Sequence, residues 1–135
     1  MQITLDHAHL FASDLAATLS FFRRMFAAET VWDQEVAGVR GVRLRIGHAF
    51  IHVYDQAPKA PRGGAVHHLG IETDDLDALV AHMRAEGIAF RNPVRRDTDF
   101  RYVMVAGPDD LLIELFECAR PQQWRLARGS AAGAP

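Results

Sequence analysis

The hydrophobic positions of this 135-residue chain follow one order of patterns twice. Residues 6–15 align with residues 67–76 at an offset of 61 (68 − 7). Each stretch alternates apolar and polar side chains, and it ends in a Ser/Thr/Asp signal that is typical of a helix N-terminus. Apolar side chains at helical spacing follow in both copies. We therefore expect two copies of one structural module.

Each copy is predicted to contain one helix and several strands. The helices are expected at residues 13–27 and 74–86, and Gly87 stands where a glycine commonly ends a helix. Besides the opening strand of each copy, the turn signals and β-branched runs predict strands at residues 30–32, 39–46, 49–54, 90–92, 102–106 and 111–116. Each module then reads βαβββ, and the fold class is α+β with two tandem modules.

The length fits a single compact domain at about residues 1–120. Module one is expected at about 1–55 and module two at about 66–118, with a linker rich in Pro and Gly at about 56–65. Beyond Pro121 the pattern is lost, and we expect residues 121–135 to form a largely disordered tail.

Composition narrows the classes of function. The hydrophobic share of 49% and the charged share of 24% are usual for soluble globular proteins. The net charge of −2 is spread without long runs of one sign, so we expect neither a nucleic acid nor a membrane as partner. No segment approaches membrane-spanning length and no signal peptide opens the chain, so a cytoplasmic location is expected. A single cysteine, Cys118, excludes an internal disulfide framework.

Four side chains of the metal-ligand type fall at equivalent positions of the two copies. His7 aligns with His68, and His52 aligns with Glu114 at an offset of 62 (114 − 52). Because side chains alternate across a strand, the aliphatic neighbours of His52 and Glu114 fall on the opposite face, under the helix. The two pairs are therefore predicted to face inward from central strands. Imidazole and carboxylate are ligands of divalent Zn, Fe, Mn, Co and Ni, so one such ion is expected.

Each of these residues also has a plainer interpretation. A lone histidine on an apolar strand is often only a hydrogen-bonded core or surface residue. Glu114 could instead be a solvent-facing strand residue, or form an ion pair with one of the arginines, for example Arg101. His52 could be a ligand, a general base or a residue that only lines a cavity.

Two further residues are candidates for proton transfer. His9 shares the face of His7, and it could be a partner of a ligand, a proton shuttle or an inert lining residue. Glu72 lies two residues after His68 on the same face, and it could act as a base or be solvated near the strand end.

A substrate could be bound by other residues on these faces. Arg43 and Arg45 share one strand face and could bind an anionic substrate through bidentate hydrogen bonds, or they could be solvated. Aromatic and aliphatic side chains could form the apolar wall of a pocket, although core packing also explains them: Phe11, Phe50, Tyr54, Leu112 and Phe116.

Residues 3–118 resemble the vicinal oxygen chelate superfamily. This superfamily includes glyoxalase I, methylmalonyl-CoA epimerase, fosfomycin resistance transferases, bleomycin resistance proteins and extradiol ring-cleaving dioxygenases. Three groups of motifs carry the resemblance: residues 5–7 with 13–15 and 21–23, residues 66–72 with 74–76, and residues 107–109 with 112–115.

The resemblance implies paired βαβββ modules whose mixed sheet curls into a cup around a metal ion, with the helices on the outer face. The first-strand histidine of the superfamily falls on His7, its fifth-strand histidine on His68 and its terminal glutamate on Glu114. Its fourth position, usually Glu or Gln in glyoxalase-like and epimerase-like members, falls on His52. That departure makes the site one charge more positive and argues against glyoxalase I activity.

The implied function is a metal-dependent isomerase, epimerase or lyase that chelates a small oxygen-bearing metabolite. It would move a proton through an enolate-like intermediate, with His52, His9 or Glu72 as the base. A homodimer is the implied assembly.

One alternative is an Fe(II) or Mn(II) ring-cleaving dioxygenase, because His7, His68 and Glu114 form a two-histidine, one-carboxylate set. The tyrosine that such enzymes place about ten residues before the glutamate is here Met104, with Tyr102 two residues away on the same face. Another alternative is a metal-free, bleomycin-resistance-like binding protein, although such proteins typically lack the four ligands. A fosfomycin-type thiol transferase is disfavoured because no counterpart of its potassium-binding loop is found.

Overall fold

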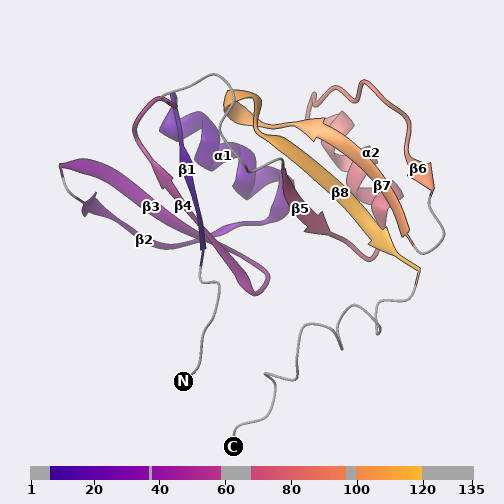
Figure 1. The fold of residues 1–135 in the computed structure, drawn as a ribbon, viewed down its shortest axis with the longest axis horizontal. Coiled ribbons are helices and arrows are strands. Elements are labelled where there is room, and N and C mark those ends of the chain that lie inside the picture. Colours follow the sequence, from indigo (N-terminus) through magenta and orange to yellow (C-terminus); the bar gives the residue numbers. More distant parts are fainter. Residues whose placement is uncertain (1–6, 37, 59–67, 97–99, 120–135) are drawn as a thin grey trace, which may run out of the picture. The chain divides into compact units, whose positions relative to one another are not determined.

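The computed structural model describes residues 7–36, 38–58, 68–96 and 100–119. The chain divides into two compact units (Figure 1). The first comprises Met1–Val66 with Gly107–Asp110, and the second comprises His67–Ala106 with Leu111–Pro135.

The first unit is built on a mixed four-stranded sheet. Its elements are β1 (His7–Phe11), α1 (Leu15–Phe26), β2 (Glu29–Val36), β3 (Val39–Ile46) and β4 (Ala49–Tyr54). The strand order is β1-β4-β3-β2. β1 pairs in parallel with β4, and the other pairings are antiparallel. The helix α1 covers one face of this sheet (Figure 1).

The helix α1 begins and ends at clear local signals. The carboxylate of Asp14 caps its N-terminus by accepting from the backbone N–H of Ala17 at 2.8 Å. Ala27 ends it in the left-handed region, with φ 50°. One stripe of the helix packs on the sheet, and the buried side chains of this core include Leu15, Leu19, Phe22, Met25, Val42, Leu44, Ile51 and Val53. Alternation therefore leaves His7, His52 and Arg43 on the other sheet face.

The second unit repeats the arrangement. Its elements are β5 (Leu69–Glu72), α2 (Leu76–Ala85), β6 (Arg95–Arg96), β7 (Phe100–Ala106) and β8 (Leu112–Cys118). The strand order is β5-β8-β7-β6, with β5 parallel to β8. The short 3₁₀ turn η1 (Pro108–Asp110) links β7 to β8 and belongs to the first unit. The buried core side chains of the second unit are Leu76, Val80, Met83, Val103, Val105, Ile113, Leu115 and Cys118.

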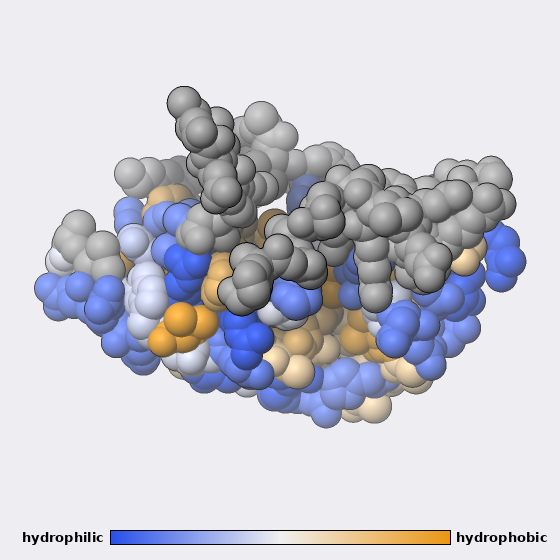
Figure 2. Space-filling view, turned by 90° about the horizontal axis from the view of Figure 1, so that it is seen from below, coloured by the Kyte–Doolittle hydropathy of each residue, from blue (hydrophilic) through white to orange (hydrophobic). Residues whose placement is uncertain are grey.

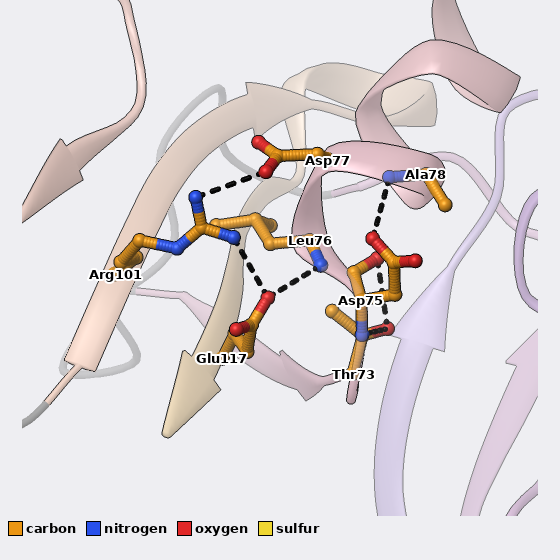
Figure 3. Close-up of polar contacts among 7 residues, drawn as sticks. All are labelled: Thr73, Asp75, Leu76, Asp77, Ala78, Arg101 and Glu117. Carbon is orange, nitrogen blue, oxygen red and sulfur yellow. Dashed lines mark hydrogen bonds and ion pairs between the residues drawn. The ribbon is translucent and has the colours of Figure 1, made fainter. Parts of the chain in front are cut away.

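A polar network fixes the N-terminus of α2 to β8 (Figure 3). One carboxylate oxygen of Glu117 accepts from the backbone N–H of Leu76 at 2.8 Å and from Arg101 Nη2 at 2.9 Å. Arg101 Nη1 also donates to Asp77 at 3.0 Å. The Leu76 N–H and then the Arg101 guanidinium hold the pKa of Glu117 below its usual range. Asp75 caps the same turn by accepting from the N–H of Ala78 at 2.9 Å.

The structure confirms the α+β class and the two βαβββ modules, and it corrects several details. The prediction of a strand at 90–92 is wrong, because the strand that pairs with β7 is Arg95–Arg96. It begins after Pro93, and proline has no backbone N–H to donate to a neighbouring strand. The strand expected at 30–32 extends over Glu29–Val36. The strands β1 and β5 are edge strands of their sheets rather than central ones. Residues 59–65 of the expected linker and the tail at 121–135 lie outside the described residues.

Hydrophilic residues make up most of the coloured surface in Figure 2, and hydrophobic residues show there as separate patches. Among the described residues, the large hydrophobic side chains that are exposed are Phe11 and Val31. Neither described helix has the length and apolar character needed to span a bilayer.

Candidate functional site

The first unit brings two of the expected metal ligands into direct contact. In the parallel pairing of β1 with β4, His9 lies opposite His52 and His7 lies opposite Phe50. The imidazoles of His7 and His52 stack with centroids 3.6 Å apart and planes 10° from parallel. These two side chains therefore form one imidazole pair on the sheet face opposite α1.

Arg43 is bonded to the second ring of this pair. The β3–β4 hairpin turns at Gly47 and His48, so Ile46 pairs with Ala49 and Arg43 pairs with His52. The Arg43 Nη1 atom lies 2.8 Å from His52 Nε2. The guanidinium carbon lies 4.1 Å from the ring centroid of Phe50, in cation–π contact.

Trp32 also contacts His52. It pairs with Arg43 across β2 and β3, after a register shift between Thr30 and Trp32. Its ring meets that of His52 edge-on at a centroid distance of 5.1 Å. Sequence reasoning missed Trp32 because the shift between Thr30 and Trp32 changes which β2 side chains share the face of Arg43. It also missed the Arg43–His52 contact, although the Gly47-His48 turn signal would have given the register.

His9 lies among aromatic side chains on the same face. Its ring centroid is 4.1 Å from that of Tyr54 and 4.8 Å from that of Phe11. Burial, and then the neighbouring charge of His7, lower the pKa of His9 from its ordinary value. A neutral imidazole is favoured at this position, and a neutral imidazole can accept a proton.

Gly41 makes room for Tyr54. A Cβ atom at this glycine would lie 2.9 Å from Cε1 of the Tyr54 ring and 3.5 Å from Trp32. The absence of a side chain at Gly41 therefore lets the two aromatic rings close over β3.

The second unit brings together the other two expected ligands. His68, immediately before β5, has its Nε2 atom 3.2 Å from an Oε atom of Glu114 on β8. Their side chains are 33% and 22% exposed. Two atoms that bind one ion through bonds of about 2.0–2.2 Å lie roughly 3–3.5 Å apart. The spacing of this pair therefore suits two ligands of one metal ion, as well as a direct hydrogen bond.

The remaining candidates of the second unit share the sheet face of Glu114. β7 and β8 place Met104 opposite Glu114 and Tyr102 opposite Phe116. Glu72 is the last residue of β5, and it also pairs with Phe116. Leu112 lies two residues before Glu114 on β8, and alternation puts it on the same face.

Two arginines have other partners. Arg45 forms an ion pair with Glu29, which lies opposite it across β2 and β3. The alternative pairing of Arg101 with Glu114 is wrong. Arg101 bonds to Asp77 and Glu117, which lie on the side of the sheet that α2 covers.

The candidate ligands therefore come together as pairs within each unit. In the part of the chain that the structure describes, no group of three or more His, Cys, Asp or Glu side chains is close enough to hold a metal ion.

Comparison with known proteins relates this arrangement to one family. The family model described as "Glyoxalase/Bleomycin resistance protein/Dioxygenase superfamily" matches residues 4–115. No match was found among curated proteins.

Several solved structures share the fold. One is a variant of the fosfomycin resistance protein FosX from Listeria monocytogenes, complexed with Mn(II) and 1S,2S-dihydroxypropylphosphonic acid. It is 21% identical, covers 93% of this chain and 99% of that one, and has a TM-score of 0.72. A glyoxalase family protein from Enterococcus faecalis is 23% identical, with coverage of 84% and 97% and a TM-score of 0.72.

A third structure is a glyoxylase/bleomycin resistance protein/dioxygenase domain from Frankia sp. EAN1pec. It is 15% identical, with coverage of 87% and 99% and a TM-score of 0.74. At these identities the structures show a common fold, and the family model covers most of this chain. The chain belongs to the glyoxalase/bleomycin resistance protein/dioxygenase superfamily, as the resemblance of its motifs had indicated.

Proposed function

We propose that this protein is a metal-dependent enzyme that binds one divalent ion through His7, His68 and Glu114. The observation that carries the proposal is the His68–Glu114 pair, in which His68 Nε2, just before β5, lies 3.2 Å from an Oε atom of Glu114 on β8. The equivalent positions of the other module hold His7 and His52, again as a close pair. All four positions therefore carry side chains that suit a metal of the Zn, Fe, Mn, Co or Ni kind.

The similar FosX structure supports a divalent ion, because it contains Mn(II). We propose an isomerase or lyase reaction on a small oxygen-bearing metabolite. The bound metal would stabilise negative charge that develops on a substrate oxygen. Within the first unit, His9 has a lowered pKa, so its neutral ring is available to take up a proton.

Aromatic and cationic side chains on the same faces are proposed to bind the substrate. In the first unit these are Phe11, Arg43, Arg45, Phe50 and Tyr54, and in the second unit Tyr102 and Leu112. Glu72, at the end of β5, is a second candidate base. We further propose a homodimer, which light scattering coupled to size-exclusion chromatography would test by mass.

A ring-cleaving dioxygenase is the second candidate, and one observation favours it. Tyr102 lies on the same sheet face as Glu114. It is paired with Phe116, which comes two residues after Glu114 on β8. His7, His68 and Glu114 would form the two-histidine, one-carboxylate set of Fe(II) oxygenases. Oxygen uptake with catechols in the presence of Fe(II) decides between the two reactions: strong uptake would displace the isomerase or lyase proposal.

Elemental analysis of protein purified without chelator tests the metal requirement. We expect one divalent ion per chain in the parent protein and a large loss of that ion in the His7→Ala and Glu114→Ala variants. A metal-free parent whose stability to heat matches that of both variants would instead support a metal-free binding protein of the bleomycin-resistance type.

A further inference from the structure

The proposed function leaves the role of His52 open, and its contact with Arg43 bears directly on that role. The contact is fixed by the backbone, because the tight turn at Gly47 and His48 places Arg43 opposite His52 on β3 and β4. Arg43 is half-buried, and its guanidinium is packed on Phe50 at 4.1 Å. The pairing of β3 with β4 and the contact with Phe50 therefore hold the Arg43 guanidinium beside the His52 ring.

The chemistry of the two groups fixes the direction of the hydrogen bond. A guanidinium carries only N–H donors and no acceptor, so Arg43 Nη1 must donate across the 2.8 Å distance. His52 Nε2 must then accept, and the proton of the neutral ring resides on Nδ1. The tautomer with its proton on Nε2 predominates for histidine in water, so this contact selects the less common form.

The same bond occupies the lone pair that a metal ion would need. A metal bound at Nε2 would lie about 2.0–2.1 Å from that atom, along the lone-pair direction that the Arg43 N–H uses. The ion and the donated hydrogen would then compete for one position, and two cationic groups would face each other there. His7 stacks on a face of the His52 ring, with the ring centroids 3.6 Å apart, so it leaves the in-plane lone pair of Nε2 to the Arg43 N–H.

We propose that Arg43 is a positioning residue that fixes His52 as the Nδ1–H tautomer and keeps its Nε2 atom out of the metal-ligand set. The inference rests on the proposed function, because it concerns the same metal site. The ion then takes His7, His68 and Glu114 from the protein, and the coordination position that His52 would have filled is left for substrate or water, as catalytic metal sites require.

The proton position on His52 tests the first half of this inference without any metal. Long-range ¹H–¹⁵N NMR of the chelator-treated protein, at a pH where the ring is neutral, distinguishes the two tautomers. We expect Nδ1–H in the parent and a shift toward Nε2–H in Arg43→Met, which keeps a long apolar side chain over Phe50. Arg45→Met is the matched control, since Arg45 is on the same strand and face but pairs with Glu29. It should leave His52 unchanged.

Mn(II) titration of the same proteins tests the second half. We expect His7→Gln to weaken Mn(II) binding by roughly a hundredfold or more, and His52→Gln to stay within about threefold of the parent. Arg43→Met should bind Mn(II) about tenfold more tightly because His52 becomes available, and adding His52→Gln to it should remove that gain.

The outcomes separate this inference from the proposed function. An Nε2–H tautomer in the parent overturns the inference, whatever the metal result. Equal losses in His52→Gln and His7→Gln also overturn it, because His52 would then be a ligand, while the proposed metal enzyme would stand. A parent protein that binds no Mn(II), Fe(II) or Zn(II) overturns the proposed function and the ligand half of the inference, and the tautomer result still decides the role of Arg43.

Discussion

Glu117 joins α2 to β8, and its replacement gives a prediction whose size follows from the structure. Glu117→Ala removes the acceptor of the Leu76 N–H at the start of the helix and one partner of Arg101. Loss of an acceptor at a helix N-terminus costs about 1 kcal/mol. The lost bond to Arg101 acts in the same direction. We expect unfolding free energy to fall by about 1–2 kcal/mol and Tm to fall by roughly 5 °C.

The assay is chemical unfolding followed by circular dichroism, together with two comparison variants. Glu117→Gln keeps an acceptor for the Leu76 N–H and should lose about half as much stability. Asp77→Ala removes only the exposed partner of Arg101 and should cost at most about 0.5 kcal/mol. Equal stability of Glu117→Ala and the parent would refute the reasoning, since the cap would then contribute nothing.

The pH dependence of this difference has a definite sign. The pKa of Glu117 is lowered in the folded protein, first by the Leu76 N–H and then by Arg101. Its contribution is therefore complete above the ordinary glutamate pKa of about 4.3, and it is lost as the pH falls through the lower folded value. The stability gap between the parent and Glu117→Ala should narrow below about pH 4. A gap that widens there would contradict the assignment.

Three further replacements test the packing and the backbone. Leu115→Ala empties a fully buried position of the second core and should cost about 2–5 kcal/mol in urea unfolding. Gly41→Ala should displace the Tyr54 ring, which a Cβ would approach to 2.9 Å, and the displacement should show as shifted Tyr54 ring resonances in NMR spectra. Gly87→Ala forces an L-residue to adopt φ 86° and should lower unfolding free energy by about 1–2 kcal/mol, measured by thermal unfolding.

Much of the fold could be predicted because each sequence pattern that indicates a strand or a helix occurs twice, once in each module. The alignment of residues 6–15 with 67–76 and the helical spacing after each stretch gave both modules and both helices. The edges of elements were harder to predict. The short pairing strand Arg95–Arg96 carries no hydrophobic alternation, whereas the apolar Phe90 before Pro93 lies outside the strands of the described part of the chain. Pairing there depends on β7, which lies later in the chain.

For the candidate site, the sequence predicted which strand faces the residues share but not the contacts between them. Alternation placed His7 and His52 on one face, and the structure stacks their rings. The bond between Arg43 and His52 depends on hairpin register, and the position of Trp32 depends on a register shift in β2. Such contacts follow from strand pairing, which periodicity along one strand does not specify.

The most direct test of the metal-site proposal is a calorimetric titration of chelator-stripped protein with MnCl₂. Glu114→Gln is the informative variant, because it replaces the carboxylate 3.2 Å from His68 with a neutral amide of the same shape. We predict one ion bound per chain in the parent and a loss of affinity on the order of a hundredfold in Glu114→Gln. Equal binding by the two proteins, or none by the parent with Mn(II), Fe(II) or Zn(II), would contradict this prediction.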